Sequence, residues 1–277
     1  KSESNRALII KAISHGKVRI DNLSEADDTV FLTRALEVAN TASEDAKIID
    51  IGPAGTAMRF MTSYLNLIPG KFTLTGTERM QQRPIGILVD ALKDIGADIH
   101  YQNKAGFPPL QIEGKIFQGK DTVKIKGDVS SQYISSLLLI ASVLKKGLTI
   151  EIQGELTSRP YVTMTLNMLE EAGVKHSWID NKITIAKQEA QESTIYIEPD
   201  WSAASYWYAI VALAQEGEIR LPGLKKNSLQ GDIAIAEIME YFGVKTTFEE
   251  KGILLQKIAI VTTKTLLDFQ DCPDLAP

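Results

Sequence analysis

A unit made of a helix, a glycine and two strands recurs three times along this chain. Residues 84–95 have the pattern of an amphipathic helix, which is followed by Gly96 and by an alternating segment that is typical of a strand. Glycine just past a helix is the usual terminator, because it adopts a positive φ without a Cβ clash. The same order recurs at residues 161–185 and 232–256, with the glycines at 173 and 243.

This recurrence predicts a structural repeat of helix, strand and strand, with further elements between the copies. The alternative is that a helix, a glycine and a strand simply follow one another often in α/β proteins. In either case the fold class is α/β. We expect strands directly after the glycines, at residues 97–101, 174–176 and 244–248, further helices at 130–144 and 202–216, and further strands at 48–51, 72–75 and 148–152.

Length and composition limit the class of protein. A chain of 277 residues corresponds to about two domains of roughly 150 residues each. The net charge of −5 and the absence of a basic stripe disfavour nucleic acid as a partner. No apolar run approaches the roughly 18 residues that span a bilayer, so no membrane partner is expected. The single cysteine, Cys272, excludes an internal disulfide, and we expect a cytoplasmic protein.

Four polar clusters stand where loops lead into predicted helices. Helix N-termini carry unsatisfied N–H groups and the positive end of the helix dipole, so they suit anions. Each cluster alone is also explained by ordinary helix capping. Together they indicate a small polyanionic substrate. The clusters begin at Lys1 (Lys-Ser-Glu-Ser-Asn-Arg), Gly52 (Gly-Pro-Ala-Gly-Thr), Arg79 (Arg-Met-Gln-Gln-Arg-Pro) and Gly127 (Gly-Asp-Val-Ser-Ser-Gln-Tyr), with a related group at Thr157.

Individual residues in these clusters have the chemistry that an anion needs. Gly55 would let a ligand approach the backbone closely. Arg83 can hold a carboxylate or phosphate through two parallel hydrogen bonds, and Pro84 suits the first turn of a helix. Metal or cofactor chemistry is not indicated: the histidines at 15, 100 and 176 have no ligand spacing, and Walker, dinucleotide-binding and nucleophile-elbow motifs are absent from the sequence. We expect no cofactor and no metal.

As an ordered set, the clusters resemble the EPSP synthases (3-phosphoshikimate 1-carboxyvinyltransferases) of the enolpyruvyl transferase family. The similarity runs from Lys1 through the Asn-Ser-Leu-Gln-Gly-Asp segment at 227–232 to Asp274, nearly the whole chain. It implies a two-lobed fold of β-α-β-α-β-β repeats with the active site in the cleft between the lobes. Residues 1–198 would be the first lobe with three repeats, and residues 199–277 an incomplete second lobe.

The resemblance also implies a reaction and its residues. The substrates would be phosphoenolpyruvate and shikimate 3-phosphate, whose 5-hydroxyl receives the enolpyruvyl group as phosphate leaves. Lys1 corresponds to the family lysine that contacts both substrates and assists proton transfer, and Asp274 to the aspartate that accepts the hydroxyl proton. The shikimate 3-phosphate ligands would be Lys1, Ser2, Arg6, Ser130, Ser131, Gln132, Ser158, Tyr161 and Asp274, and the phosphoenolpyruvate ligands Lys1, Gly55, Arg83 and Gln132.

Two departures from the family pattern carry consequences. Pro53 stands where the family often has asparagine, so it offers neither a carboxamide nor a backbone N–H to a ligand. The later Asn, Lys-Glu, Arg and Lys elements of the family have no counterpart before Pro277. We therefore expect a polypeptide ending at Pro277 to be inactive, and we expect further residues on both sides of the chain in the intact protein.

Two other functions stay open at this stage. A transferase acting on UDP-N-acetylglucosamine would share the fold, but its catalytic loop carries a cysteine that residues 75–82 lack. A non-catalytic domain of the same fold could bind an anionic metabolite. Gly55 also predicts that glyphosate, a compact phosphonate, competes with phosphoenolpyruvate. We expect a monomer.

Overall fold

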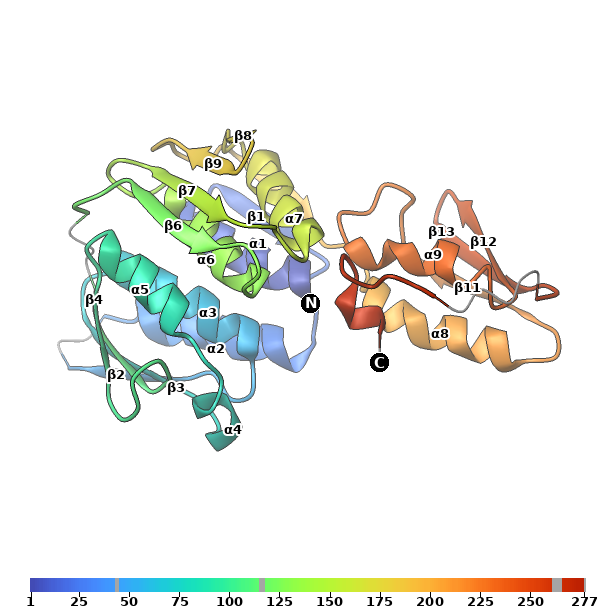
Figure 1. Ribbon diagram of the computed structural model, residues 1–277, viewed down its shortest axis with the longest axis horizontal. Helices are drawn as coiled ribbons and strands as arrows, with labels where there is room; N and C mark the ends of the chain where they lie inside the picture. The colour runs from blue at the N-terminus through green and yellow to red at the C-terminus, as the bar shows by residue number, and fades with distance from the viewer. Residues whose placement is uncertain (43–44, 115–117, 261–265, 277) are drawn as a thin grey trace. The chain divides into compact units, whose positions relative to one another are not determined.

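Two four-stranded sheets with the same strand order form the framework of the first three quarters of the chain (Figure 1). In each sheet the first two strands are parallel, and the third and fourth form an antiparallel hairpin beside them. The first sheet has the order β2-β3-β5-β4 and consists of β2 (Lys47–Asp50), β3 (Lys71–Thr75), β4 (Asp98–Tyr101) and β5 (Leu110–Glu113). The second has the order β6-β7-β9-β8 and consists of β6 (Thr122–Lys126), β7 (Leu148–Gln153), β8 (Ser177–Ile179) and β9 (Lys182–Ile185).

Helices connect the strands of each sheet in the same order. The first sheet has α3 (Gly55–Tyr64) after β2 and α5 (Gly86–Asp94) after β3, and the second has α6 (Ser131–Ala141) after β6 and α7 (Arg159–Glu171) after β7. Both copies therefore follow the expected β-α-β-α-β-β path, and the α/β class is confirmed. The remaining elements here are α1 (Ser2–Ile13), β1 (Val18–Asp21), α2 (Asp27–Asn40), the short η1 (Leu65–Leu67) and α4 (Glu78–Gln81), and β10 (Ser193–Tyr196), which pairs with β1 in parallel.

Helices α1, α3 and α6 pack against one another and form the centre of this region. Their burial explains their composition: α6 is buried from Tyr133 to Ala141, and α3 from Ala57 to Tyr64. The strands instead alternate between buried and exposed side chains, as in β5 and β6. Such alternation is expected for a sheet that covers a core with one face and meets water with the other.

The three glycines predicted to end helices do so with one hydrogen-bond arrangement. Gly96, Gly173 and Gly243 have φ values of 109°, 79° and 80°. Each donates its N–H to the carbonyl three residues earlier, and the next residue donates to the carbonyl five residues before it, as in the Schellman motif. A side chain at these positive φ values would be strained, so the choice of glycine has a physical cause.

Three sequence expectations about elements were wrong. Residues 174–176 form no strand, because the N–H of Val174 closes the end of α7 and that of Lys175 bonds the Gln188 side chain; β8 begins at Ser177. Pro84 precedes the helix, since α5 begins at Gly86. The single helix expected over residues 232–242 is replaced by η2 (Gly231–Ala234) and the one-turn α9 (Ile235–Ile238).

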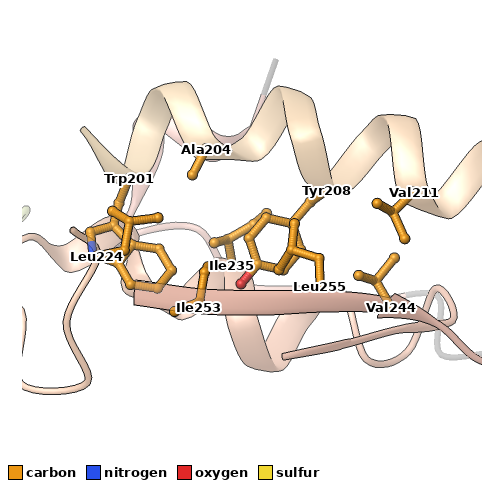
Figure 2. Packing of buried hydrophobic residues seen from close by; sticks show 9 residues of the cluster. All are labelled: Trp201, Ala204, Tyr208, Val211, Leu224, Ile235, Val244, Ile253 and Leu255. Carbon is orange, nitrogen blue, oxygen red and sulfur yellow. The ribbon is translucent and has the colours of Figure 1, made fainter. Parts of the chain in front are cut away.

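The last part of the chain has its own small core, seen in Figure 2. Three antiparallel strands in the order β11-β13-β12 carry α8 (Trp201–Leu213) on one face. Trp201, Tyr208 and Val211 point from α8 toward the sheet, with Val211 over Val244, and all four are almost fully buried. The strands are β11 (Glu218–Pro222), β12 (Val244–Glu249) and β13 (Gly252–Lys257), and η3 (Pro273–Leu275) follows.

The opposite side of α8 is apolar and exposed. Tyr206, Trp207, Ile210 and Leu213 follow helical spacing, and Leu213 is 89% exposed. Contiguous exposed apolar surface of this kind is uncommon on soluble domains and favours association.

The structure is a computed structural model that describes residues 1–42, 45–114, 118–260 and 266–276. By contact it divides into a first unit, residues 1–156 and 165–197, and a second unit, residues 157–164 and 198–277. The chain enters the second unit after Leu156, returns to the first unit within α7 after Met164, and enters the second unit again after Ile197. No helix within the described ranges has the length and apolarity needed to cross a bilayer.

Candidate active site

The first unit brings three of the predicted phosphoenolpyruvate ligands to the start of α3. The helix begins at Gly55, directly after the buried Ala54, whose methyl side chain cannot cap it. The first N–H groups of α3 are therefore available to an anion, together with the positive end of the helix dipole. Pro53 is exposed in the preceding turn.

Arg83 lies directly against this helix start. A Cβ placed on Gly55 would come within 2.1 Å of Arg83 Nη1 and within 2.7 Å of its Cζ. The Arg83 side chain is exposed, and within the described ranges it has neither a hydrogen bond nor an ion pair. An unpaired guanidinium beside an uncapped helix start is an arrangement that binds carboxylate or phosphate.

Gln132 joins the starts of α6 and α3. Its Nε2 donates a 3.3 Å hydrogen bond to Oγ1 of Thr56, the residue after Gly55. Ser130 caps α6, because its hydroxyl oxygen accepts from the Gln132 N–H, and Ser131 is buried. The capping interpretation thus holds for Ser130, and the role of these two serines as phosphate ligands stays a prediction.

The start of α1 has a different character. Lys1 is half-exposed, and its Nζ lies 3.6 Å from the Asp28 carboxylate of α2. Arg6 is only 2% exposed and donates to Ser2 O at 3.0 Å, to Thr165 Oγ1 at 2.7 Å and to Ser135 Oγ at 3.2 Å. Arg6 therefore fastens α1 to α6 and α7 in this structure. The contact that the resemblance implies between Arg6 and a substrate carboxylate stays a prediction.

The second unit brings together two further predicted residues. Tyr161 Oη, from the first turn of α7, donates a 2.9 Å hydrogen bond to Oδ2 of Asp274 in η3. Asp274 is exposed, which leaves its carboxylate accessible. Ser158, just before α7, has a φ of 53°. This left-handed conformation is uncommon for a residue with a side chain and often marks a functional turn.

Asp232, at the end of the Asn-Ser-Leu-Gln-Gly-Asp segment, is 4% exposed near the same carboxylate. Burial raises the pKa of the Asp232 carboxyl, the hydrogen bond from the Ser202 hydroxyl opposes this, and the nearby Asp274 carboxylate raises the pKa further. The same segment anchors α8, since Gln230 Oε1 accepts from the Trp201 N–H at 2.8 Å. This segment therefore has a clear structural role in the second unit.

Sequence reasoning left Arg59 out of the site. It is 4% exposed, and its two terminal nitrogens donate to Gly55 O at 3.2 Å and Pro84 O at 3.1 Å. Burial lowers the pKa of the Arg59 guanidinium, and the neighbouring Arg83 lowers it further. One signal was available in the sequence: Arg59 stands four residues after Gly55, which places both on one face of a helix.

Within the described ranges no three histidine, cysteine, aspartate or glutamate side chains gather in a way that could hold an ion. Cys272 is a buried free cysteine. The groups at the start of α3 are cationic and amide donors, which suit an anion.

The repeated sheets and helices have the architecture of the enolpyruvyl transferase fold. Residues 1–277 match the family described as EPSP synthase (3-phosphoshikimate 1-carboxyvinyltransferase), and the chain belongs to that family. A 3-phosphoshikimate 1-carboxyvinyltransferase of Bacteroides fragilis is 49% identical over the whole chain, and one of Tolumonas auensis is 37% identical. The chain spans 66% of the length of the first relative and 69% of that of the second.

Solved structures agree with the fold. An EPSP synthase from Acinetobacter baumannii has a TM-score of 0.75 over the whole chain, at 20% identity and with 66% of its own length covered. A second structure of EPSP synthase from that organism has a TM-score of 0.71 over 93% of the chain. At this identity the likeness concerns the fold.

Proposed function

We propose that the protein transfers the enolpyruvyl group of phosphoenolpyruvate to the 5-hydroxyl of shikimate 3-phosphate and releases phosphate. The observation that carries the proposal is the exposed Arg83 guanidinium, which has no partner among the described residues and lies over Gly55 at the uncapped start of α3. Membership of the EPSP synthase family supports it. Both substrates are polyanions, and two anions held side by side need cations to offset their repulsion.

The chemistry assigns roles to the remaining residues. The substrate hydroxyl must lose a proton as its oxygen adds to C2 of phosphoenolpyruvate, while C3 gains a proton. The protein must therefore place a base beside the hydroxyl and an acid beside C3. Collapse of the adduct returns the C3 proton and breaks the bond from C2 to the phosphate oxygen. We propose Asp274 as the base toward the hydroxyl and Lys1 as a proton carrier.

The ligands that we propose for shikimate 3-phosphate, besides Lys1 and Asp274, stand near the starts of α1, α6 and α7. They are Ser2, Arg6, Ser130, Ser131, Gln132, Ser158 and Tyr161. The hydrogen bond from Tyr161 to Asp274 supports a common role for those two residues, because it fixes one carboxylate oxygen and leaves the other for the substrate. Gly55, Arg83 and Gln132 would hold phosphoenolpyruvate.

The alternative substrate, UDP-N-acetylglucosamine, is not favoured by the family match or by the curated relatives. Titration calorimetry on the purified full-length protein tests the choice. We expect binding of shikimate 3-phosphate and of phosphoenolpyruvate, with Arg83→Met weakening the latter. Preferential binding of UDP-N-acetylglucosamine would overturn the proposal. Release of inorganic phosphate on mixing the full-length protein with both substrates would separate a transferase from a non-catalytic domain.

Several narrower proposals accompany this one. The lobes would be residues 1–198 and 199–277, and the protein would be a cytoplasmic monomer. Glyphosate would compete with phosphoenolpyruvate at Gly55. A mass measurement in solution tests the oligomeric state, and inhibition that does not depend on phosphoenolpyruvate concentration would contradict competition.

A further inference from the structure

Among the described residues, the buried guanidinium of Arg59 has no carboxylate partner. Arg59 is 4% exposed, and it forms no ion pair there with aspartate or glutamate. Its buried Nε likewise has no hydrogen-bond partner among those residues. Removing a cation from water without an opposite charge is unfavourable, so such a group is uncommon in a purely structural position.

The contacts of Arg59 converge on the residues around Arg83. One terminal nitrogen donates to Gly55 O and approaches Met80 Sδ at 3.7 Å, and the other donates to Pro84 O. Pro84 O also accepts a 2.7 Å bond from Tyr133 Oη. The carbonyl that follows Arg83 in the chain is therefore held from both α3 and α6.

These bonds fix the two parts that must meet at the anion site. Gly55 O belongs to the residue under the Arg83 guanidinium, and Pro84 O belongs to the peptide next to Arg83. A single planar guanidinium spans both, which a lysine ammonium cannot do in the same geometry. Arg59 also adds a second positive charge beside Arg83, and its charge is weakly screened because it is buried.

The geometry points to Arg59 as a positioning residue that sets the affinity of the Arg83–Gly55 site for phosphoenolpyruvate without touching the ligand. This inference rests on the proposed function, because it takes phosphoenolpyruvate as the anion at Arg83. Arg59 acts in two ways. It holds the backbone on either side of the site, and its positive charge, added to that of Arg83, makes the binding of an anion more favourable.

The test compares Arg59→Met, which keeps side-chain length without charge, with Arg59→Lys, which keeps charge without the two-carbonyl bridge. Arg34→Met is the matched control, since Arg34 is an exposed arginine on α2 of the same unit. Titration calorimetry on the full-length protein and its variants gives the affinities for phosphoenolpyruvate and, separately, for shikimate 3-phosphate. Hydrogen exchange at the amides of Arg83 and Ile85 reports the loop itself.

We expect Arg59→Met to weaken phosphoenolpyruvate binding by about 10-fold to 100-fold. A loss of this size is comparable to that caused by removing one charge-assisted hydrogen bond. Arg59→Lys should recover part of this loss, and the amides at 83 and 85 should exchange faster in both variants. Shikimate 3-phosphate affinity should change by less than about 2-fold, as should both affinities in Arg34→Met.

The outcomes separate the inference from the function it rests on. Wild-type affinity for phosphoenolpyruvate in a folded Arg59→Met would overturn the positioning role and leave the proposed function standing. Should Arg59→Met fail to fold, wild-type affinity for phosphoenolpyruvate in Arg59→Lys would overturn the role of the bridge from Arg59 to the carbonyls of Gly55 and Pro84. A wild-type protein that binds shikimate 3-phosphate but no phosphoenolpyruvate would overturn the assignment of the site and the role of Arg59 together.

Discussion

The Arg83 guanidinium occupies the space that a side chain on Gly55 would fill, with Nη1 2.1 Å from the position of the missing Cβ. Gly55 does not have a positive φ, so glycine is not required there by the backbone. The close approach of Arg83 is the physical reason for glycine at this position. The proposed anion site therefore includes both residues, which should respond together to substitution.

Gly55→Ala should preserve the fold but weaken phosphoenolpyruvate binding by at least about 10-fold. The new methyl group meets the flexible end of Arg83, which can move away at little cost to stability but then leaves the helix start. Gly119→Ala is the control, because Gly119 has open space around its Cα. Titration calorimetry measures the affinity and urea unfolding the stability. Unchanged affinity for phosphoenolpyruvate would show that the anion lies elsewhere.

Thr165→Val should lower the free energy of unfolding by about 2 kcal/mol, because it leaves Arg6 Nε as a buried charged donor without its 2.7 Å acceptor. Thr33→Val is the matched control: its hydroxyl only donates to the carbonyl one turn earlier in α2. Urea unfolding of the two variants measures the difference. Equal losses would mean that the Arg6 network contributes nothing beyond ordinary local hydrogen bonding.

The sequence predicted the recurring order of helix, glycine and strand because this order follows from local chemistry, whereas the full β-α-β-α-β-β path came from the family resemblance. A positive φ and a change of hydrophobic period are visible within a dozen residues. Residues 174–176 were misassigned because the end of α7 and the Gln188 side chain use their N–H groups, and no local pattern shows this.

The candidate site was predictable to a similar extent. The ordered clusters identified Gly55 and Arg83, which can meet a ligand directly. Arg59 was missed because its second carbonyl, Pro84 O, stands 25 residues further along the chain, and the bond depends on how α3 packs. Residues that act through buried contacts are determined by the tertiary structure, so their roles became visible only there.

Tyr208→Phe should lower stability by about 1 kcal/mol near neutral pH through loss of the 2.8 Å bond to Thr246. Burial raises the pKa of Tyr208 from 10.0 to about 12. The folded state therefore holds the phenolic proton more tightly than the unfolded state. This stabilisation is complete below pH 10 and is lost as the pH rises through about 12.

The variant should lose that alkaline dependence, so its deficit against wild type should shrink as the pH rises through this window. Tyr206→Phe is the control, because Tyr206 is 74% exposed. Urea unfolding curves recorded across the window, followed by tryptophan fluorescence, give the comparison. A deficit that stays constant with pH would contradict the buried, neutral state of Tyr208.

In a polypeptide limited to residues 1–277, replacing both Ile210 and Leu213 by lysine should suppress concentration-dependent self-association without lowering stability by more than about 0.5 kcal/mol. Both side chains lie on the exposed face of α8, and Leu213 is 89% exposed, so their burial between molecules favours association. Lysine in the last turn also interacts favourably with the helix dipole.

Val211→Lys is the control: Val211 is 2% exposed and points into the core drawn in Figure 2, so the charge should unfold the second unit. Sedimentation velocity over a concentration series measures the association. A wild-type protein that stays monomeric at all concentrations would remove the exposed α8 face as a cause of self-association.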